Sequence, residues 1–74
     1  MKDALEYIVS NIVDGTVTVD ENDQDGFVTL TIHAPKEEIG KIIGKGGKTI
    51  NAIKNILKIR AIKEGKKIDI QVAE

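Results

Sequence analysis

The spacing of apolar residues predicts a helix at the start of the chain. Leu5, Ile8, Val9 and Ile12 recur at intervals of three or four residues. Asp3 followed by Glu6 resembles a capping box with Asp at the first position. The pattern therefore predicts a helix over residues 3–13, which Asp14-Gly15 ends because glycine tolerates the left-handed conformation.

Alternation of β-branched and other residues then replaces the helical spacing. Residues 16–19 and 27–32 both alternate and are rich in valine and threonine, as strands are. The stretch 20–26 between them is polar and ends in Asp25-Gly26, a turn dipeptide. We predict a β-hairpin with a long polar loop.

Helical spacing returns in the second half of the chain. Pro35 suits the first turn of a helix, and the acids that follow it favour the positive end of the helix dipole. Beyond Gly47 a second repeat predicts a helix over residues 48–63, stopped by Gly65. The repeat consists of Ile50, Ile53, Ile56, Leu57 and Ala61.

Ile68, Ile70 and Val72 alternate and predict a last strand, so the element order is α-β-β-α-α-β. The final β-α-α-β portion is a crossover, which places residues 27–33 and 67–73 in one sheet with helices packed on one face. The pattern predicts one α+β domain over residues 1–74, with a three-stranded mixed sheet.

Composition narrows the function. The 74 residues include no cysteine, so thiolate metal sites, disulfides and cysteine nucleophiles are excluded. No apolar run approaches the roughly 18 residues of a membrane span, and no secretory leader is recognisable. We expect a cytoplasmic protein that does not enter a membrane. Its small core favours binding at a shallow surface over catalysis in a deep pocket.

Charge is distributed unevenly along the chain. The formal net charge is −1, but residues 1–35 carry one base and seven acids, whereas residues 36–74 carry ten bases and five acids. A basic surface can therefore form if the second half makes one face, despite a balance that at first argues against a nucleic-acid partner.

The loop between the two predicted helices has more glycine than a helix ending needs. Gly44, Gly46 and Gly47 occupy three of four positions, and glycines let a backbone approach a ligand closely. The loop also leads into a helix N-terminus, whose N–H groups attract anions. Lys45 and Lys48 add positive charge, so the segment suits a phosphodiester.

Ile42-Ile43-Gly44-Lys45-Gly46-Gly47-Lys48-Thr49-Ile50 resembles the signature of KH domains. The element order resembles the type II KH topology over essentially the whole chain, and the size resembles small bacterial single-KH proteins of the KhpA type. This resemblance implies that the Gly-X-X-Gly loop clamps about four nucleotides of single-stranded RNA. The second X is itself glycine, so the lysines must supply most of the charge.

The RNA-binding residues that the resemblance and the charge pattern predict are Ile43, Gly44, Lys45, Gly46, Gly47, Lys48, Ile50 and Lys54. The four loop residues form the clamp, and Ile43 and Ile50 are its apolar supports. Lys54 extends a basic track, a role that ordinary solvated lysines also fit. Ile39, Ile42, Ile53 and Leu57 are better interpreted as core.

Other chemistries fit the sequence poorly. Gly47-Lys48-Thr49 resembles the end of a P-loop, but Ile42 stands where that motif needs glycine. His33 lacks the further ligands of a zinc site, and the acids at 20–25 lack calcium-loop spacing. Tyr7 and Phe27 lie outside any basic strand motif, so no aromatic stacking sheet is predicted. We therefore predict no enzyme activity, no metal and no cofactor.

Two hypotheses of function remain. The first is an RNA-binding module with little sequence specificity, acting as an RNA chaperone or small-RNA regulator. The second is an interaction module that forms a homodimer, or a heterodimer with a larger KH-containing protein, as the resemblance also implies. Ile59 and Ile62 fall outside the buried stripe of the helix 48–63 and offer an apolar surface for such pairing.

Overall fold

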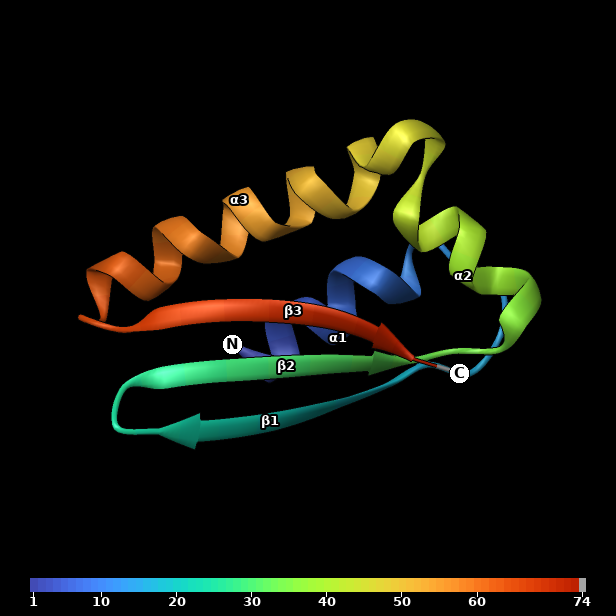
Figure 1. Cartoon of the computed structure of the whole chain (residues 1–74). Helices are drawn as coiled ribbons and strands as arrows, with labels where there is room; N and C mark the ends of the chain where they lie inside the picture. Colours follow the sequence, from blue (N-terminus) through green and yellow to red (C-terminus); the bar gives the residue numbers. More distant parts are fainter. Residues whose placement is uncertain (74) are drawn as a thin grey trace.

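A computed structural model describes residues 1–73 of the chain. Its elements follow the predicted order (Figure 1). They are α1 (Lys2–Ser10), β1 (Thr18–Gln24), β2 (Phe27–His33), α2 (Lys36–Ile43), a single 3₁₀ turn η1 (Lys45–Gly47), α3 (Lys48–Lys63) and β3 (Lys67–Ala73). The ranges of α3, β2 and β3 agree with the sequence prediction.

The three strands form one mixed sheet in the order β1-β2-β3. β1 and β2 pair antiparallel, from Thr18 opposite His33 to Gln24 opposite Phe27. β2 and β3 pair parallel, from Phe27 opposite Lys67 to His33 opposite Ala73. The predicted α+β fold with a three-stranded mixed sheet is therefore confirmed, and the α2-α3 crossover joins the two parallel strands.

The helices cover one face of this sheet. Figure 1 shows α1 and α3 on the same side of the strands, with α2 at the end where the chain leaves β2. Alternate residues of β2 are buried beneath them, and Leu5, Ile42 and Leu57 close the core from the helices. The other face carries polar side chains, including Thr29 and Thr31. Packing of this core against the sheet therefore positions α3 over the strands.

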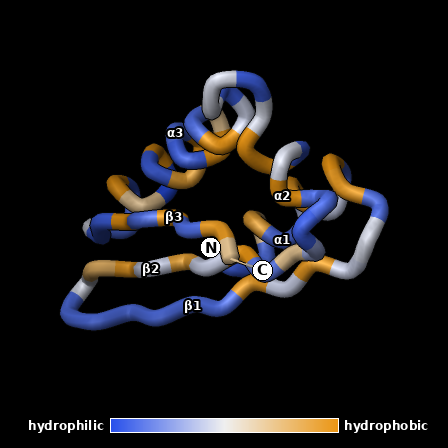
Figure 2. Tube along the Cα trace, turned by 45° about the vertical axis from the view of Figure 1, so that its right-hand side comes forward, coloured by the Kyte–Doolittle hydropathy of each residue, from blue (hydrophilic) through white to orange (hydrophobic). Residues whose placement is uncertain are grey.

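The hairpin prediction was wrong about its loop. β1 continues through the polar residues to Gln24, and the connection is only Asp25-Gly26. Both turn residues have positive φ, 55° and 84°, which suits a two-residue turn that matches the strand twist. Only Val19 of β1 is buried, so the acids lie on a solvated edge strand (Figure 2).

The first helix also differs from its prediction. It begins at Lys2 rather than at a capping Asp3, because Glu21 of β1 accepts the Lys2 N–H at 3.2 Å. It ends at Ser10, three residues early, since the side chains of Ser10 and Asn11 both donate to the Tyr7 carbonyl. The predicted capping box is therefore absent, and a contact from the sheet caps the helix instead.

Candidate functional site

The loop between α2 and α3 depends on glycine at its first position. Gly44 has φ 75° and ψ 173°. A Cβ there would lie 2.7 Å from Thr49 Cβ and 2.9 Å from Thr49 N. Both the backbone conformation and this close approach therefore require a residue without a side chain. Gly44 makes the sharp exit from α2 and brings the loop against the first turn of α3.

Gly46 differs from Gly44 in its surroundings. Its φ is 65° and no atom lies within 4 Å of where a Cβ would stand, so the space above it is open. The loop backbone is held on both sides, by the Gly44 N–H donating to the Gly40 carbonyl at 2.9 Å and the Gly47 N–H donating to Gly44 at 3.2 Å. The result is a fixed, exposed turn of main chain.

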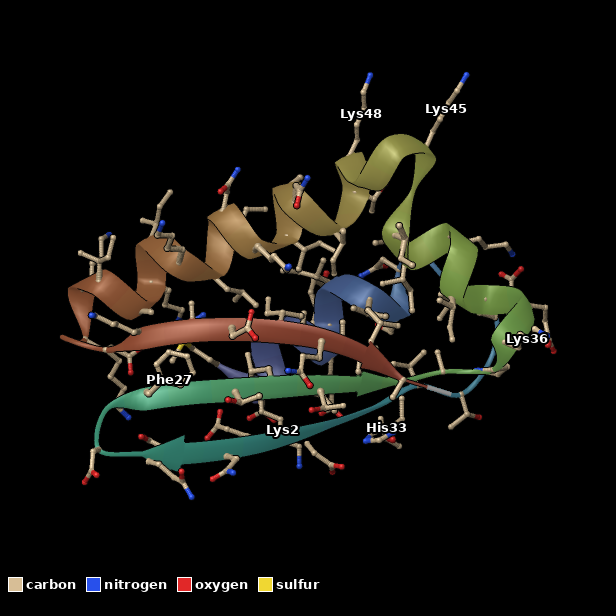
Figure 3. The ribbon with its side chains drawn as sticks, in the orientation of Figure 1. Lys2, Phe27, His33, Lys36, Lys45 and Lys48 are labelled. Carbon is tan, nitrogen blue, oxygen red and sulfur yellow. The ribbon has the colours of Figure 1, made fainter. Side chains whose placement is uncertain are left out.

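Positive charge stands directly on this turn. Lys45 and Lys48 are exposed and point away from the body of the protein (Figure 3). No carboxylate of residues 1–73 lies within 4.0 Å of either ammonium group. Within the same residues no side chain caps the N-terminus of α3, and its first turn holds no acid. The helix dipole and two mobile cations therefore face solvent together.

A groove runs along the side of α3 from Asn51 onward. We name it the near groove; it has a volume of about 470 Å³ and lies between α3 and β3. Its lining consists of Asn51, Lys54, Asn55, Lys58, Ile68, Asp69 and Ile70. The four residues from α3 follow helical spacing and form one face, so a chain that leaves the loop meets lysines and amides in succession.

The floor of the near groove is the free edge of the sheet. Lys67 donates its N–H to the Gly26 carbonyl at 2.9 Å, so its backbone groups face β2. Residues alternate along a parallel ladder, so Ile68 and Ile70 direct their N–H and C=O groups outward instead. The groove thus offers backbone donors and acceptors beside apolar side chains, the chemistry that the edge of a nucleobase needs.

The structure brings together most of the residues that the sequence singled out. Gly44 to Lys48 form one exposed turn, and Lys54 lines the near groove six residues after Lys48. Ile43 is 38% exposed beside the loop. Ile50 is half-buried and packs against the core, so it supports the first turn of α3 rather than offering a surface.

Sequence reasoning missed the polar lining and the strand edge. Asn51 and Asn55 lie on the same helix face as Lys54 and Lys58, and this spacing could have indicated them. Ile68 and Ile70 gave no such signal, because only the strand order makes β3 an edge.

Ion pairs fix the helix that presents the loop. Lys41 of α2 lies 3.2 Å from a Glu38 oxygen and 3.4 Å from Asp14, in the segment between α1 and β1. Hydrogen bonds to Glu38, then to Asp14, raise the pKa of Lys41 above its usual value. The bridge ties the last turn of α2, which leads into Gly44, to the segment between α1 and β1.

The remaining candidates do not form a site. His33 lies 2.8 Å from Asp20 on the polar face of the sheet, with both side chains solvated. Residues 1–73 hold no cluster of three or more His, Cys, Asp or Glu side chains arranged to bind a metal. Over the same residues, none of the helices has the length and apolar character to cross a membrane.

Comparison with known proteins is consistent with this geometry. The sequence model of the KhpA/KhpB KH domain matches residues 2–72. The RNA-binding protein KhpA of Chlamydia caviae is 38% identical, covering 100% of this chain and 97% of its own length. The RNA-binding proteins KhpA of Clostridium perfringens and Caldanaerobacter subterraneus are 35% and 32% identical, each over 97% of this chain and 99% of their own. No solved structure matches significantly.

Proposed function

Because this chain belongs to the KhpA/KhpB KH-domain family, we propose that it binds single-stranded RNA by clamping the sugar-phosphate backbone against residues 44–47. The curated relatives are named RNA-binding proteins, and they match this chain over essentially its full length. The role is binding rather than catalysis.

The conformation of the loop carries this proposal. Gly46 leaves open space above a fixed main chain, Lys45 and Lys48 stand beside it, and the uncapped start of α3 lies beneath. A phosphodiester placed there meets backbone N–H groups at close range and two cations that no carboxylate of residues 1–73 approaches within 4.0 Å. Bases that follow the backbone then enter the near groove, between the amides of α3 and the outward backbone of Ile68 and Ile70.

Replacing Lys45 and Gly46 together by Asp tests the clamp. Two carboxylates would then face the phosphates, so we expect RNA binding to be lost. The fold should survive, because Asp tolerates the left-handed conformation and Gly46 has no neighbour to clash with. Circular dichroism reports the fold, and fluorescence anisotropy with labelled single-stranded RNA reports affinity.

A matched control separates position from net charge. Lys2→Asp with Asn22→Asp changes the charge by the same amount at exposed residues of α1 and β1, away from the loop. We expect this control to lose much less affinity than the loop variant. Unchanged binding by a folded Lys45→Asp, Gly46→Asp protein would contradict the clamp.

In the cell, we propose that the chain acts in the cytoplasm as an RNA chaperone or small-RNA regulator. A clamp for about four nucleotides that relies on backbone contacts and a shallow groove selects sequence weakly. Weak selection suits a protein that serves many RNAs.

A specific surface favours a second, compatible function in assembly with another KH-domain chain. Ile56, Ile59 and Ile62 of α3 are 56%, 60% and 66% exposed, and we name them the outer apolar stripe. Ile62 also borders the groove at the C-terminal end of α3. Ile56 belongs to the repeat that predicts the helix, yet the structure turns it to solvent. Three exposed branched residues at three-residue spacing suit an interface with a second copy.

A further inference from the structure

A second groove continues the near groove beyond the residues assigned above. We name it the far groove; its volume is about 410 Å³ and it lies at the C-terminal end of α3. It is lined by Phe27, Lys58, Ile62, Lys66, Lys67 and Ile68. Lys58 and Ile68 line both grooves, so the two are continuous along one side of the α3–β3 layer.

The geometry points to a second nucleotide-binding subsite in the far groove, where the ring of Phe27 stacks a base and Lys58 and Lys67 bind the phosphates beside it. The inference rests on the proposed function, because the RNA reaches the far groove from the loop. It extends the RNA path past the four nucleotides that a KH clamp holds.

The surroundings of Phe27 support this assignment. Phe27 is one of two aromatic residues in the chain that carry a six-membered ring, and it is 49% exposed at the start of β2. Figure 3 shows it at the end of the sheet below the C-terminal end of α3, opposite the end that carries Lys45 and Lys48. An exposed aromatic ring with lysines around it is the combination that binds single strands without sequence preference.

Charge in the far groove favours a polyanion. Lys58 and Lys67 have no carboxylate of residues 1–73 within 4.0 Å, so both are available to phosphates. The third lysine is held in place: Lys66 Nζ lies 2.7 Å from Asp23 of β1. A tight turn fixes its backbone, since the Lys66 N–H donates to Ala61 and the Gly65 N–H to Ile62.

The helix face that borders the near groove leads directly into the far groove. Asn51, Asn55, Lys58 and Ile62 follow one another at three- and four-residue intervals, so they lie in a row along α3. This 16-residue helix spans about 24 Å at the rise of an α-helix. An RNA strand that follows the row meets lysines and amides first and the apolar, aromatic end last.

Two lengths of RNA distinguish this subsite from the clamp. We would titrate fluorescein-labelled oligouridine of four and of ten nucleotides with the wild type and with Phe27→Leu, Lys67→Gln. We expect the variant to bind the ten-nucleotide RNA about tenfold more weakly, as loss of one stacked base and one phosphate contact implies. Its affinity for the four-nucleotide RNA should change by less than about twofold.

Tyr7→Leu with Lys2→Gln is the matched control, because it removes the other such ring and a lysine from α1. It should bind both RNAs like the wild type. Equal losses on both RNAs, or no loss on the longer one, would overturn the subsite. Loss of binding to both RNAs by the Lys45→Asp, Gly46→Asp protein upholds the clamp, whatever the result for the far groove. Failure of the subsite and failure of the clamp are therefore distinguishable.

Lys67→Gln alone supplies a readout that does not depend on packing. For the longer RNA only, a plot of the logarithm of its association constant against the logarithm of salt concentration should be shallower by about 0.7 than the wild-type plot.

Ile59→Lys tests whether a second copy of the chain, rather than the far groove, provides the extra contacts to the longer RNA, since Ile59 lines neither groove. If Ile59→Lys weakens binding of the longer RNA as much as Phe27→Leu, Lys67→Gln does, the far groove is not the subsite.

Discussion

At the scale of single residues, Gly44 and Gly46 lie two positions apart and have different requirements. Both have positive φ. Gly44 also lies too close to Thr49 for any side chain, whereas Gly46 faces open space. Gly44 is therefore required by the fold, and Gly46 is the position where a side chain would meet the RNA backbone in the proposed clamp.

We predict that Gly44→Ala lowers the free energy of unfolding by about 2 kcal/mol or more, because strain at positive φ adds to a backbone clash. Gly46→Asn is the control and should cost less than about 1 kcal/mol, since Asn tolerates this conformation. Urea unfolding of the two variants measures the difference. Equal stabilities would show that the contact with Thr49 imposes no constraint.

At the scale of elements, a single ion pair ties the hairpin to the end of α3. Lys66 follows α3, Asp23 lies on β1, and their charged groups are 2.7 Å apart. The hydrogen bond from Lys66 holds the pKa of Asp23 below its usual 3.8, and the hydrogen bond to Asp23 raises the pKa of Lys66 above 10.5. The pair therefore favours the folded state only while both groups are charged.

The pKa shifts set the direction of a pH dependence. Because the folded pKa of Asp23 is lowered, its contribution is present above pH 3.8 and is lost as pH falls through the folded value. We predict that Asp23→Asn is less stable than the wild type at pH 6, and that the two stabilities converge as pH falls through the folded pKa of Asp23. The raised pKa of Lys66 gives the mirror effect, lost above pH 10.5.

Urea unfolding at a series of pH values checks this, and Asp25→Asn serves as the control because Asp25 lies in the adjacent turn without an ion pair among residues 1–73. A gap between wild type and Asp23→Asn that stays constant from pH 6 to pH 2 would rule out the ion pair as its cause.

At the scale of the whole molecule, the two signs of charge are segregated. β1 carries Asp20, Glu21 and Asp23 on its solvated edge, whereas α3 carries five bases and no acid. The net charge of −1 therefore hides a basic side that can attract a polyanion.

This segregation predicts a salt dependence. If the clamp neutralises about three phosphates of a short single strand, the logarithm of the association constant should fall with the logarithm of salt concentration with a slope of roughly −2. Anisotropy titrations of the four-nucleotide RNA between low and physiological salt measure it. A flat response would favour assembly, rather than RNA binding, as the main role.

The outer apolar stripe makes a separate prediction about assembly. We expect the wild type to self-associate at micromolar concentration, and Ile59→Lys with Ile62→Lys to remain monomeric, because two charges would enter an apolar interface. Sedimentation equilibrium decides it. Lys54→Ile, a change in the near groove, controls for altered hydrophobicity. A monomeric wild type, or a variant that dimerises equally well, would show that this face is not the interface.

Local sequence determined the elements in which one periodic pattern of apolar residues runs through the whole segment. The apolar repeat in residues 48–63 and the alternation in residues 27–33 and 67–73 predicted those elements to the residue. The glycines at 44–47 indicated the loop, because Gly44, Gly46 and Gly47 all adopt a positive φ that other residues rarely do. These features depend on periodicity and on φ, which adjacent residues fix by themselves.

Only the tertiary structure decided the features in which distant residues meet. Pairing with β2 converted the polar residues 20–24 from a loop into a strand, and Glu21 shifted the start of α1. The strand order left the edge of β3 open beside α3, which made the near groove. Phe27 reached the lysines of the far groove in the same way. The physical reason is that these contacts join residues separated by tens of positions, whose proximity only the packing of the sheet establishes.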